Sequence, residues 1–552
     1  MGKNIYPILN KSCCVLFFGL LLVFFGLATW SNSDLLGPPG FLFMDERFVF
    51  DYVKRILDAP SINELWWAIA DGGDHRYGRI FYYTAAIFAW LPYLTFSDAG
   101  LIFGIRFSLV ILMLASYVIL SLGLLKTWPG RLISLFLLLC LPFTTYYLTM
   151  PKPEPVLLLM LALFLVVAKR NRFHFGAHWI FLGCAYGAKI SAAPFVGVAG
   201  IISIMASFLD RIPIRQFASQ ALKGCGFFML GFVIAVPFLI HPKPKNIDAY
   251  LGWTWRGTGH GADDISVNWK IWLSELLTES QVTNNYYSSA EAKCILVLIF
   301  VIICLNGVFW TINRKPEKWA QAMPWFYLAL ALSAFVPIIL FVQRLWGIYL
   351  HPGFCLGIVS LVAISEATVK MQDIKTCKKG WICLSLIAVT ATILFLSVNV
   401  MPKVYLSYKK LASRTKTTEH LNQAENYKKI QKILADIQKT YFGNRKPLTV
   451  YYDPWLYKPD SSSQFTIMPF WSYDIPYRSS PDLIVYDYKN TLCYLINHKA
   501  LPTSNVKEFQ MLSDAKNKFS QNVDIKNNRP DKKNYHLFFD ANLEFGIAIK
   551  SQ

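Results

Sequence analysis

The sequence predicts a polytopic α-helical membrane protein with a small α/β domain at its C-terminal end. Of its 552 residues, 54% are hydrophobic and only 16% are charged, whereas a soluble globular protein carries roughly 25% charged residues. Apolar runs close to the ~20 residues that cross a bilayer recur along residues 1–400. Residues 401–552 then become Lys- and Asn-rich. An ordinary soluble enzyme and a disordered chain are both excluded.

The apolar runs are assigned to spans in chain order. The first, 13–30, follows Lys3 and Lys11, is long, and lacks a convincing small-x-small cleavage site. We therefore predict a transmembrane helix with a cytoplasmic N-terminus, rather than a signal peptide. The later runs are 80–96, 101–125, 131–149, 155–168, 177–190, 192–209, 226–241, 293–312, 322–342, 345–366 and 380–400.

The basic residues indicate which runs cross, because Lys and Arg accumulate in cytoplasmic loops. If every run crossed, the cluster at 169–172 would face outside. If 80–96 lies in the membrane interface instead, all the basic clusters become cytoplasmic. These clusters are 126–131, 169–172, 211–215, 314–318 and 370–379. The run 80–96 is aromatic and contains Pro92, which suits an interfacial helix. We predict about eleven spans in the plasma (inner) membrane, with the C-terminal domain outside.

This topology predicts where a functional site lies. Its long extracytoplasmic stretches are 31–100, 242–290 and 401–552, and its cytoplasmic loops are short. A site built from loops would therefore face outward. Part of the net charge of +20 is then topological, another part lies on the outer domain, and the charge is no footprint of nucleic acid. The sequence contains neither a GxxxxGK[ST] phosphate loop nor a GxGxxG turn.

The first outer loop begins with a predicted amphipathic helix, Asp45–Leu57. One face of this helix is apolar and consists of Phe48, Val49, Tyr52 and Ile56. The charged residues are expected on the opposite face. Asp45 and Glu46 stand at the start of the helix. They would act as an N-cap and a favourable charge for the helix dipole, or as an acid pair with one member serving as general base. The two interpretations are compatible.

Met44-Asp45-Glu46-Arg47, just beyond the first span, resembles the Asp-Glu motif of the GT-C membrane glycosyltransferases. The pattern is similar to that of the protein O-mannosyltransferases and the lipid A aminoarabinose transferases. Further motifs follow in the family's order: Tyr77–Tyr83, Arg106-Phe107-Ser108, Pro151–Pro155, Gly187-Ala188-Lys189, Gln343–Trp346 and Tyr349–Pro352. The resemblance covers roughly residues 10–400. One departure is the stretch Gly72–Gly78, where the aminoarabinose transferases have Glu-Lys-Pro.

The resemblance implies a GT-C fold and the transfer of a sugar from a polyprenyl-phosphate donor, with inversion, to an acceptor on the outer face. The acceptor would be an envelope lipid, glycan or protein. Such a reaction needs a base for the attacking group, and we assign Asp45, with Glu46 beside it. It also needs cations for the departing phosphate and an apolar groove for the lipid tail. The candidate residues for donor phosphate and substrate are His75, Arg76, Arg79, Lys152, Glu154, Lys189 and Arg344.

Lys189 lies within an otherwise apolar stretch. An ionisable residue in a span is by default a candidate for function, although a lysine near the end of a span also snorkels to the interface. Glu154 lies in the same predicted layer and is a candidate partner. The simpler interpretation of Glu154 is the N-terminal acid of its span.

The second outer loop contains the stretch 253–264, with three glycines around His260. Its simplest interpretation is a solvated loop followed by a helix cap. The alternatives are a mobile lid, or a weak metal site through His260 and Asp263 that would hold a divalent cation. No cofactor is otherwise indicated.

The C-terminal domain, 401–552, is predicted to contain an amphipathic helix at 418–441. Its predicted strands are 448–453, 482–488, 535–540 and 545–550. No catalytic constellation is evident in it. Its basic surface would attract anionic lipid headgroups or an acidic glycan, or would simply be solubilising.

Two other functions remain open. A transporter or flippase of a lipid-linked substrate would also have many spans and buried charge. Transporters often contain internal repeats, however, and we find none. A structural membrane subunit of an envelope assembly would need neither Lys189 nor the acid pair.

Overall fold

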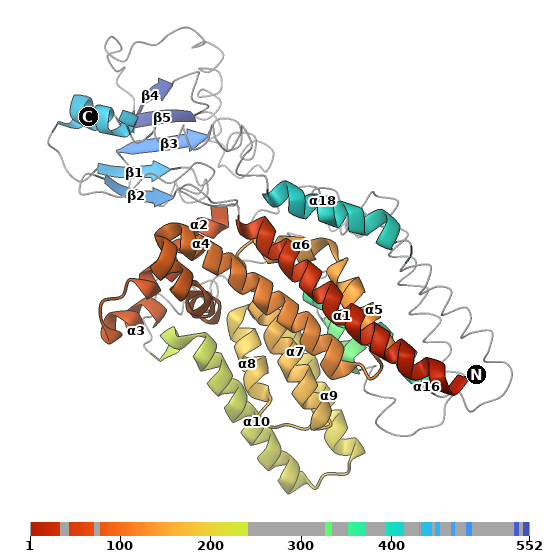
Figure 1. The fold of residues 1–552 in the computed structure, drawn as a ribbon. Helices are drawn as coiled ribbons and strands as arrows, with labels where there is room; N and C mark the ends of the chain where they lie inside the picture. The colour runs from red at the N-terminus through yellow and green to blue at the C-terminus, as the bar shows by residue number, and fades with distance from the viewer. Residues whose placement is uncertain are drawn as a thin grey trace, which may run out of the picture. The chain divides into compact units, whose positions relative to one another are not determined.

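A computed structural model describes the chain over the following residues: 2–33, 44–70, 78–240, 326–333, 351–370, 394, 396–412, 430, 432–443, 448–452, 465–469, 482–487, 535–539 and 545–550. These residues divide into two units, with the main division after residue 413. The first unit is helical, and the second is built on a five-stranded sheet (Figure 1).

The helical unit is that of a membrane protein. Four described helical segments are long and apolar enough to cross a bilayer: Asn10–Ser33, Ile80–Leu124, Ile190–Leu209 and Ile214–Ala235. Three described apolar helices are shorter: Trp128–Leu139, Trp179–Ala188 and His351–Glu366. The polytopic helical class is therefore confirmed, and the count of about eleven spans stays a prediction.

The first helix, α1 (Gly2–Ser33), contains the predicted first span. It packs against α4 (Ile80–Leu124), α5 (Trp128–Leu139) and α18 (Met401–Ala412), the last through Phe24 and Tyr408, whose ring centroids lie 6.2 Å apart. Helix α18 continues from the π-helix η4 (Leu396–Val400) and belongs to the helical unit.

The predicted amphipathic helix is present as α2 (Met44–Leu57), followed by α3 (Ile62–Ala70). Val49, Val53 and Ile56 are buried along one face of α2. Glu46 lies on this same face and is 1% exposed. The expectation that the charges lie opposite the apolar face is therefore wrong for Glu46. The physical reason is that Glu46 finds a buried cationic partner.

The helical segment α4 (Ile80–Leu124) is two helices joined at a sharp bend. The bend lies at Phe96 and Ser97, where Ser97 has a φ of 52°. A Cβ atom at Gly100 would overlap Pro92, and one at Gly104 would overlap Ala89. The arm before the bend therefore folds back against the arm after it, and these two glycines allow the backbones to touch.

The first arm of this hairpin is the run predicted to be interfacial. It presents an exposed apolar face, which includes Trp90, Leu91 and Leu94. Such a face suits contact with lipid. The interfacial position of 80–96 stays a prediction.

The predicted run 131–149 is not one helix. It divides into α5 and α6 (Pro142–Thr149), because Pro142 has no N–H with which to continue the α5 ladder. At the start of α5, the Thr127 hydroxyl accepts from the Gly130 N–H (3.1 Å). Helix α7 (Glu154–Arg170) then has Glu154 in its first turn and Lys169 and Arg170 in its last, as the helix dipole favours.

Helices α8 (Trp179–Ala188) and α10 (Ile214–Ala235) lie side by side (Figure 1). Helix α10 begins well before the predicted run 226–241. Glycines bring the two backbones together, because a Cβ at Gly183 would overlap Phe228 and one at Gly231 would overlap Ile180. The 3₁₀ turn η1 (Ile190–Ala192) and α9 (Ala193–Leu209) follow α8, and the 3₁₀ turn η2 (Pro237–Leu239) follows α10.

Three of the predicted cytoplasmic basic clusters meet at one end of the helical unit. The Lys169 ammonium donates to the carbonyls of Gly123 and Leu124 at the end of α4 (2.9 Å each). Asp210, after α9, contacts His174 (2.8 Å) and Arg172 (3.6 Å).

The C-terminal end of α16 (His351–Lys370) lies at this same end of the unit. Its Glu366 carboxylate accepts the N–H groups of Lys126 (2.8 Å) and Thr127 (2.9 Å). The clusters 126–131, 169–172 and 211–215 therefore share one end, as the positive-inside prediction requires. That this end faces the cytoplasm stays a prediction.

The second unit contains a mixed sheet with the strand order β2-β1-β3-β5-β4. Its strands are β1 (Leu448–Tyr452), β2 (Phe465–Pro469), β3 (Leu483–Asp487), β4 (Tyr535–Phe539) and β5 (Phe545–Lys550). Strand β1 pairs in parallel with β2 and β3, and β5 pairs antiparallel with β3 and β4. The four predicted strands are present, and β2 was not predicted.

One face of the sheet carries the core of this unit. Leu448 and Val450 of β1 and Leu483 and Val485 of β3 are fully buried at alternate positions. A helical segment before β1, which includes the π-helix η6 (Gln438–Phe442), packs against these residues. It contributes Ile430, Leu434, Ile437 and Phe442 to the core. The described part of the predicted helix 418–441 therefore supplies apolar residues at the expected spacing.

Candidate functional site

The structure describes six of the predicted site residues. Glu46, Arg79, Lys152, Glu154 and Lys189 have described surroundings, and Asp45 is described as the second residue of α2 without its side chain. The other five lie outside the described residues: His75, Arg76, His260, Asp263 and Arg344.

The first feature of the site is a buried ion pair between Glu46 of α2 and Arg106 of α4. Arg106 donates from Nε to Oε1 and from Nη2 to Oε2 of Glu46. Arg106 is 0% and Glu46 1% exposed. Such a two-bond fork fixes both the distance and the orientation of a carboxylate. The pair therefore determines how the start of α2, including Asp45, sits on the bundle.

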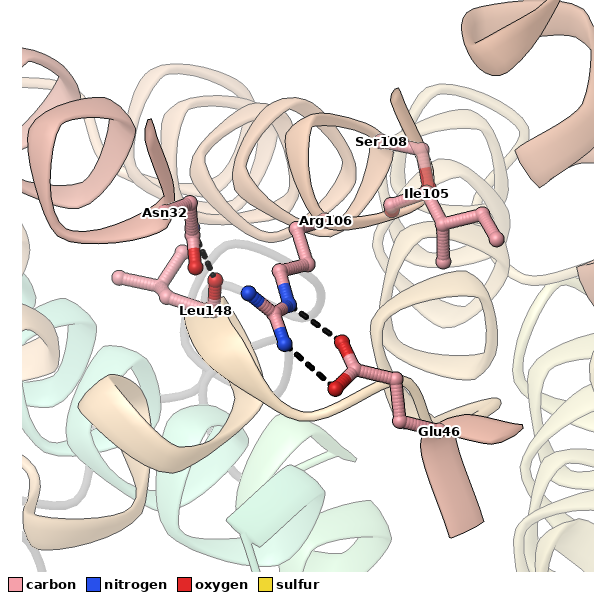
Figure 2. Close-up of polar contacts among 6 residues, drawn as sticks. All are labelled: Asn32, Glu46, Ile105, Arg106, Ser108 and Leu148. Atoms are coloured by element: carbon pink, nitrogen blue, oxygen red, sulfur yellow. Dashed lines mark hydrogen bonds and ion pairs between the residues drawn. The ribbon is translucent and has the colours of Figure 1, made fainter. Parts of the chain in front are cut away.

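Figure 2 shows this pair beside the Asn32 side chain at the end of α1. The Asn32 amide donates to the Leu148 carbonyl (2.9 Å), which joins the end of α1 to α6. Figure 2 shows the Arg106 guanidinium between this contact and Glu46. Three elements of the helical unit, α1, α2 and α6, thus converge on α4 at this point.

Arg106 was not among the predicted site residues. A signal for it was present, because it is a charged residue inside an apolar stretch, the same rule that singled out Lys189. Its part in the Arg-Phe-Ser stretch of the family resemblance was a second signal. Its partner Glu46 was invisible to the sequence, because the two residues belong to different elements.

The second feature is an ion pair between Lys189 and Glu154. The Lys189 ammonium donates to Oε1 of Glu154. The Glu154 side chain is 3% and the Lys189 side chain 13% exposed. The partnership expected between these residues is present. Glu154 therefore does more than favour the dipole of α7.

Lys189 occupies an interruption between two helices. Its backbone is extended, with φ −155° and ψ 129°, between the end of α8 and the turn η1. Pro194, in the first turn of α9, cannot donate the N–H that a continuous helix would require. The break turns the chain at Lys189 and directs its side chain toward the first turn of α7.

Both ion pairs lie far from the basic end of the unit. Helices α4 and α7 end together where Lys169 contacts the Gly123 and Leu124 carbonyls. At about 1.5 Å per helical residue, Arg106 is about 27 Å and Glu154 about 23 Å from that contact. The two buried pairs therefore share the end opposite the basic clusters.

In addition to the Glu46–Arg106 pair, other contacts attach α2 and the residue after it to both arms of the α4 hairpin. The Lys54 ammonium contacts the Asp98 carboxylate just after the bend (2.6 Å). The Tyr93 hydroxyl of the first arm donates to Asp58 (2.5 Å). The Tyr52 ring meets the Tyr82 ring edge-on at 5.2 Å. These contacts place α2 over the hairpin.

Arg79 lies at the start of the first arm and is 2% exposed. Its guanidinium faces the rings of Tyr52, Tyr82 and Phe238, with centroids 5.9, 5.7 and 5.9 Å from Cζ. Cation–π attraction at such distances favours a buried guanidinium. Lys152 lies in the turn between α6 and α7 and is partly exposed.

A further polar group lies inside the bundle. The Tyr117 hydroxyl is within hydrogen-bonding distance of Thr144 Oγ1 (2.7 Å) and His351 Nε2 (2.9 Å). The Thr144 hydroxyl in turn donates to the Leu138 carbonyl (2.8 Å). His351 is 0% exposed and is the first residue of α16. This group joins α4, α6 and α16.

No cluster of three or more His, Cys, Asp and Glu side chains that could hold a metal occurs within the described residues. The weak metal candidates, His260 and Asp263, lie outside them. What the described site offers is two carboxylates held by cations in an apolar bundle. Such an arrangement can orient a base and bind an anion in a site of low dielectric constant.

The comparisons with known proteins find a likeness in structure and no match by sequence. No family model matches the sequence, and no curated protein matches it significantly. ArnT from Cupriavidus metallidurans bound to undecaprenyl phosphate is similar in structure, with a TM-score of 0.49 and 12% identity over 88% of this chain and 94% of that chain. The apo state of the same protein gives a TM-score of 0.47 and 12% identity over 88% and 95%.

Proposed function

We propose that the protein is a membrane glycosyltransferase that moves a sugar from a polyprenyl-phosphate donor to an acceptor on the outer face of the membrane, with inversion. The observation that carries this proposal is the pairing of Glu46 with Arg106 and of Glu154 with Lys189 at one end of an apolar bundle. Buried ion pairs add little net stability, and charged residues inside membrane bundles are commonly functional.

Asp45 is the proposed base. It is the second residue of α2, next to Glu46, and the Glu46–Arg106 fork holds this helix end against the bundle. A base must be held within hydrogen-bonding reach of the group that it deprotonates. Glu46 is therefore the residue that orients Asp45, in addition to its predicted place in the acid pair.

Cations of the site would stabilise the departing polyprenyl phosphate. Lys189 is the best-supported phosphate ligand, because it is partly exposed and lies at the break between α8 and α9. Lys152, in the turn before α7, is a second candidate. Arg76, Arg344 and His75 keep this role as predictions from the sequence.

The distribution of charges supports the proposal that transfer takes place on the outer face of the membrane. The basic clusters share one end, and the two buried pairs lie at the other. If the basic end is cytoplasmic, as the positive-inside rule predicts, the pairs lie toward the outer side. Apolar side chains exposed on α1, α9 and α10 would face lipid. Both the donor tail and the membrane lipids would meet such surfaces.

The test is sugar transfer by purified protein in lipid nanodiscs, with a polyprenyl-phosphate sugar as donor and membrane extract as acceptor. We expect Asp45→Asn to abolish transfer while expression and folding are retained. Glu64→Gln, the same carboxylate-to-amide change at an exposed position of α3, should keep at least about half of the activity, because surface substitutions are usually mild.

Full transfer by Asp45→Asn would refute the assignment of the base. Movement of the lipid-linked sugar across the membrane without transfer would instead favour a flippase.

A further inference from the structure

The short segment Gly78–Arg79 joins the ends of two helices. The Gly78 N–H donates to the Ala188 carbonyl (3.2 Å), and the Arg79 N–H donates to the Ala235 carbonyl (2.7 Å). Ala188 is the last residue of α8 and Ala235 the last of α10. Carbonyls at a helix C-terminus have no partner within their own helix. Two consecutive N–H groups thus cap two neighbouring helices.

This double cap requires close approach of three backbones. A Cβ atom at Gly78 would overlap the Gly187 carbonyl group, and one at Gly187 would overlap Ala235. Glycine is therefore needed at both positions for α8, α10 and the segment to meet. Larger residues would push the two helix ends apart.

The cap is directly coupled to the Glu154–Lys189 pair. Lys189 follows the capped residue Ala188 and has an extended backbone. In the part of the chain that the structure describes, its only backbone hydrogen bond to α8 is therefore the one that its own N–H donates to the Ala185 carbonyl. The Arg79 guanidinium is buried among Tyr52 of α2, Tyr82 of α4 and Phe238 of η2. The segment therefore fixes Lys189 on one side and contacts α2, the helix of Asp45, on the other.

We propose that Gly78 and Arg79 are positioning residues, which hold Lys189 against Glu154 and hold α2 in a fixed position relative to this pair. Arg79 then acts through its neighbours rather than as a ligand of the donor phosphate, the role that the sequence suggested for it. The placement of Lys189 stands on the contacts alone. Its consequence for the donor rests on the proposed function.

The first test is hydrogen exchange of the folded protein in nanodiscs, followed by mass spectrometry of peptides covering residues 185–192. In Gly78→Ala, we expect the amides of Lys189 and Ala192 to exchange at least about tenfold faster, because local opening is governed by the free energy of these contacts. Gly197→Ala is the matched control, since a Cβ there meets nothing within 4 Å. Unchanged exchange in Gly78→Ala would overturn the proposal.

The second test separates positioning from bulk stability. In Arg79→Met, we expect the KM for the polyprenyl-phosphate donor to rise at least about tenfold, because Lys189 is displaced, and kcat to fall as well, because α2 carries the proposed base; a loss of folded protein alone would lower kcat and leave KM unchanged. Arg79→Lys keeps the cation among the rings and should restore most of this loss. Arg131→Met is the control, because Arg131 also faces a ring, that of Trp128 at 4.8 Å, at the opposite end of the unit.

Binding of undecaprenyl phosphate, measured by native mass spectrometry, keeps the two proposals distinguishable. A wild-type protein that neither binds this lipid nor transfers sugar would refute the proposed function, and the exchange experiment would still decide the double cap. A wild-type protein that binds it, with Arg79→Met binding equally well, would refute the positioning role. Loss of folding in Arg79→Met alone leaves Arg79→Lys and Gly78→Ala to decide.

Discussion

Removing one partner of the Glu46–Arg106 pair should destabilise the protein far more than removing both. Both side chains are almost completely buried, and the pair makes two hydrogen bonds. Arg106→Met leaves the Glu46 carboxylate buried without its cation, which costs about 3–5 kcal/mol. The double change, Glu46→Leu with Arg106→Met, removes both desolvated charges. It should lie within about 1 kcal/mol of the wild type or be more stable.

The assay is unfolding by SDS in mixed micelles, followed by tryptophan fluorescence, for the wild type, the two single variants and the double variant. A double-mutant cycle isolates the coupling between the two residues. Lys54→Met is the matched control, because the Lys54–Asp98 pair joins the same two elements but is 35% and 48% exposed. Its loss should cost no more than about 1 kcal/mol.

Two results would refute this reasoning. One is an Arg106→Met protein within about 1 kcal/mol of the wild type, which would mean that Glu46 finds water or another partner at no cost. The other is a double variant as unstable as the sum of the singles. A stable double variant that still transfers sugar at the wild-type rate would separately show that Asp45 does not depend on Glu46.

Two further predictions concern other parts of the helical unit. Gly104→Val should force the arms of the α4 hairpin apart at Ala89 and lower the melting temperature more than Gly26→Val, where nothing lies within 4 Å; equal melting would contradict the hairpin contact. Tyr117→Phe leaves His351 without the hydroxyl and should cost about 1–3 kcal/mol in SDS unfolding; a change below about 0.5 kcal/mol would contradict the hydrogen bond.

Local patterns made much of the architecture predictable. Apolar runs and basic flanks indicated α1, α7 and α9, and the spacing of apolar residues indicated α2, because these signals lie within one element. Four strands of the sheet were predicted for the same reason. Strand β2 was missed because its five residues end in a proline and give too short an alternation.

The pairing of charges was only partly predictable. Lys189 was recognisable because a lysine in an apolar run is unusual, and Glu154 was a candidate partner through the predicted layers. Arg106 was equally recognisable by that rule. That Glu46, rather than its neighbours, turns inward to meet Arg106 depends on how α2 lies on the α4 hairpin, which no local pattern encodes.

The sequence by itself determined a membrane protein of many apolar helices, the ends at which its basic clusters gather, and an acid pair at the start of α2. Hydropathy and charge act on each segment separately, so these features could be read along the chain. Only the tertiary structure decided that 80–96 folds back at Ser97, that two ion pairs share one end of the bundle, and that Gly78–Arg79 caps α8 and α10 together. Such contacts join residues far apart in sequence, and the glycines that permit them are informative only when the opposing backbone is known.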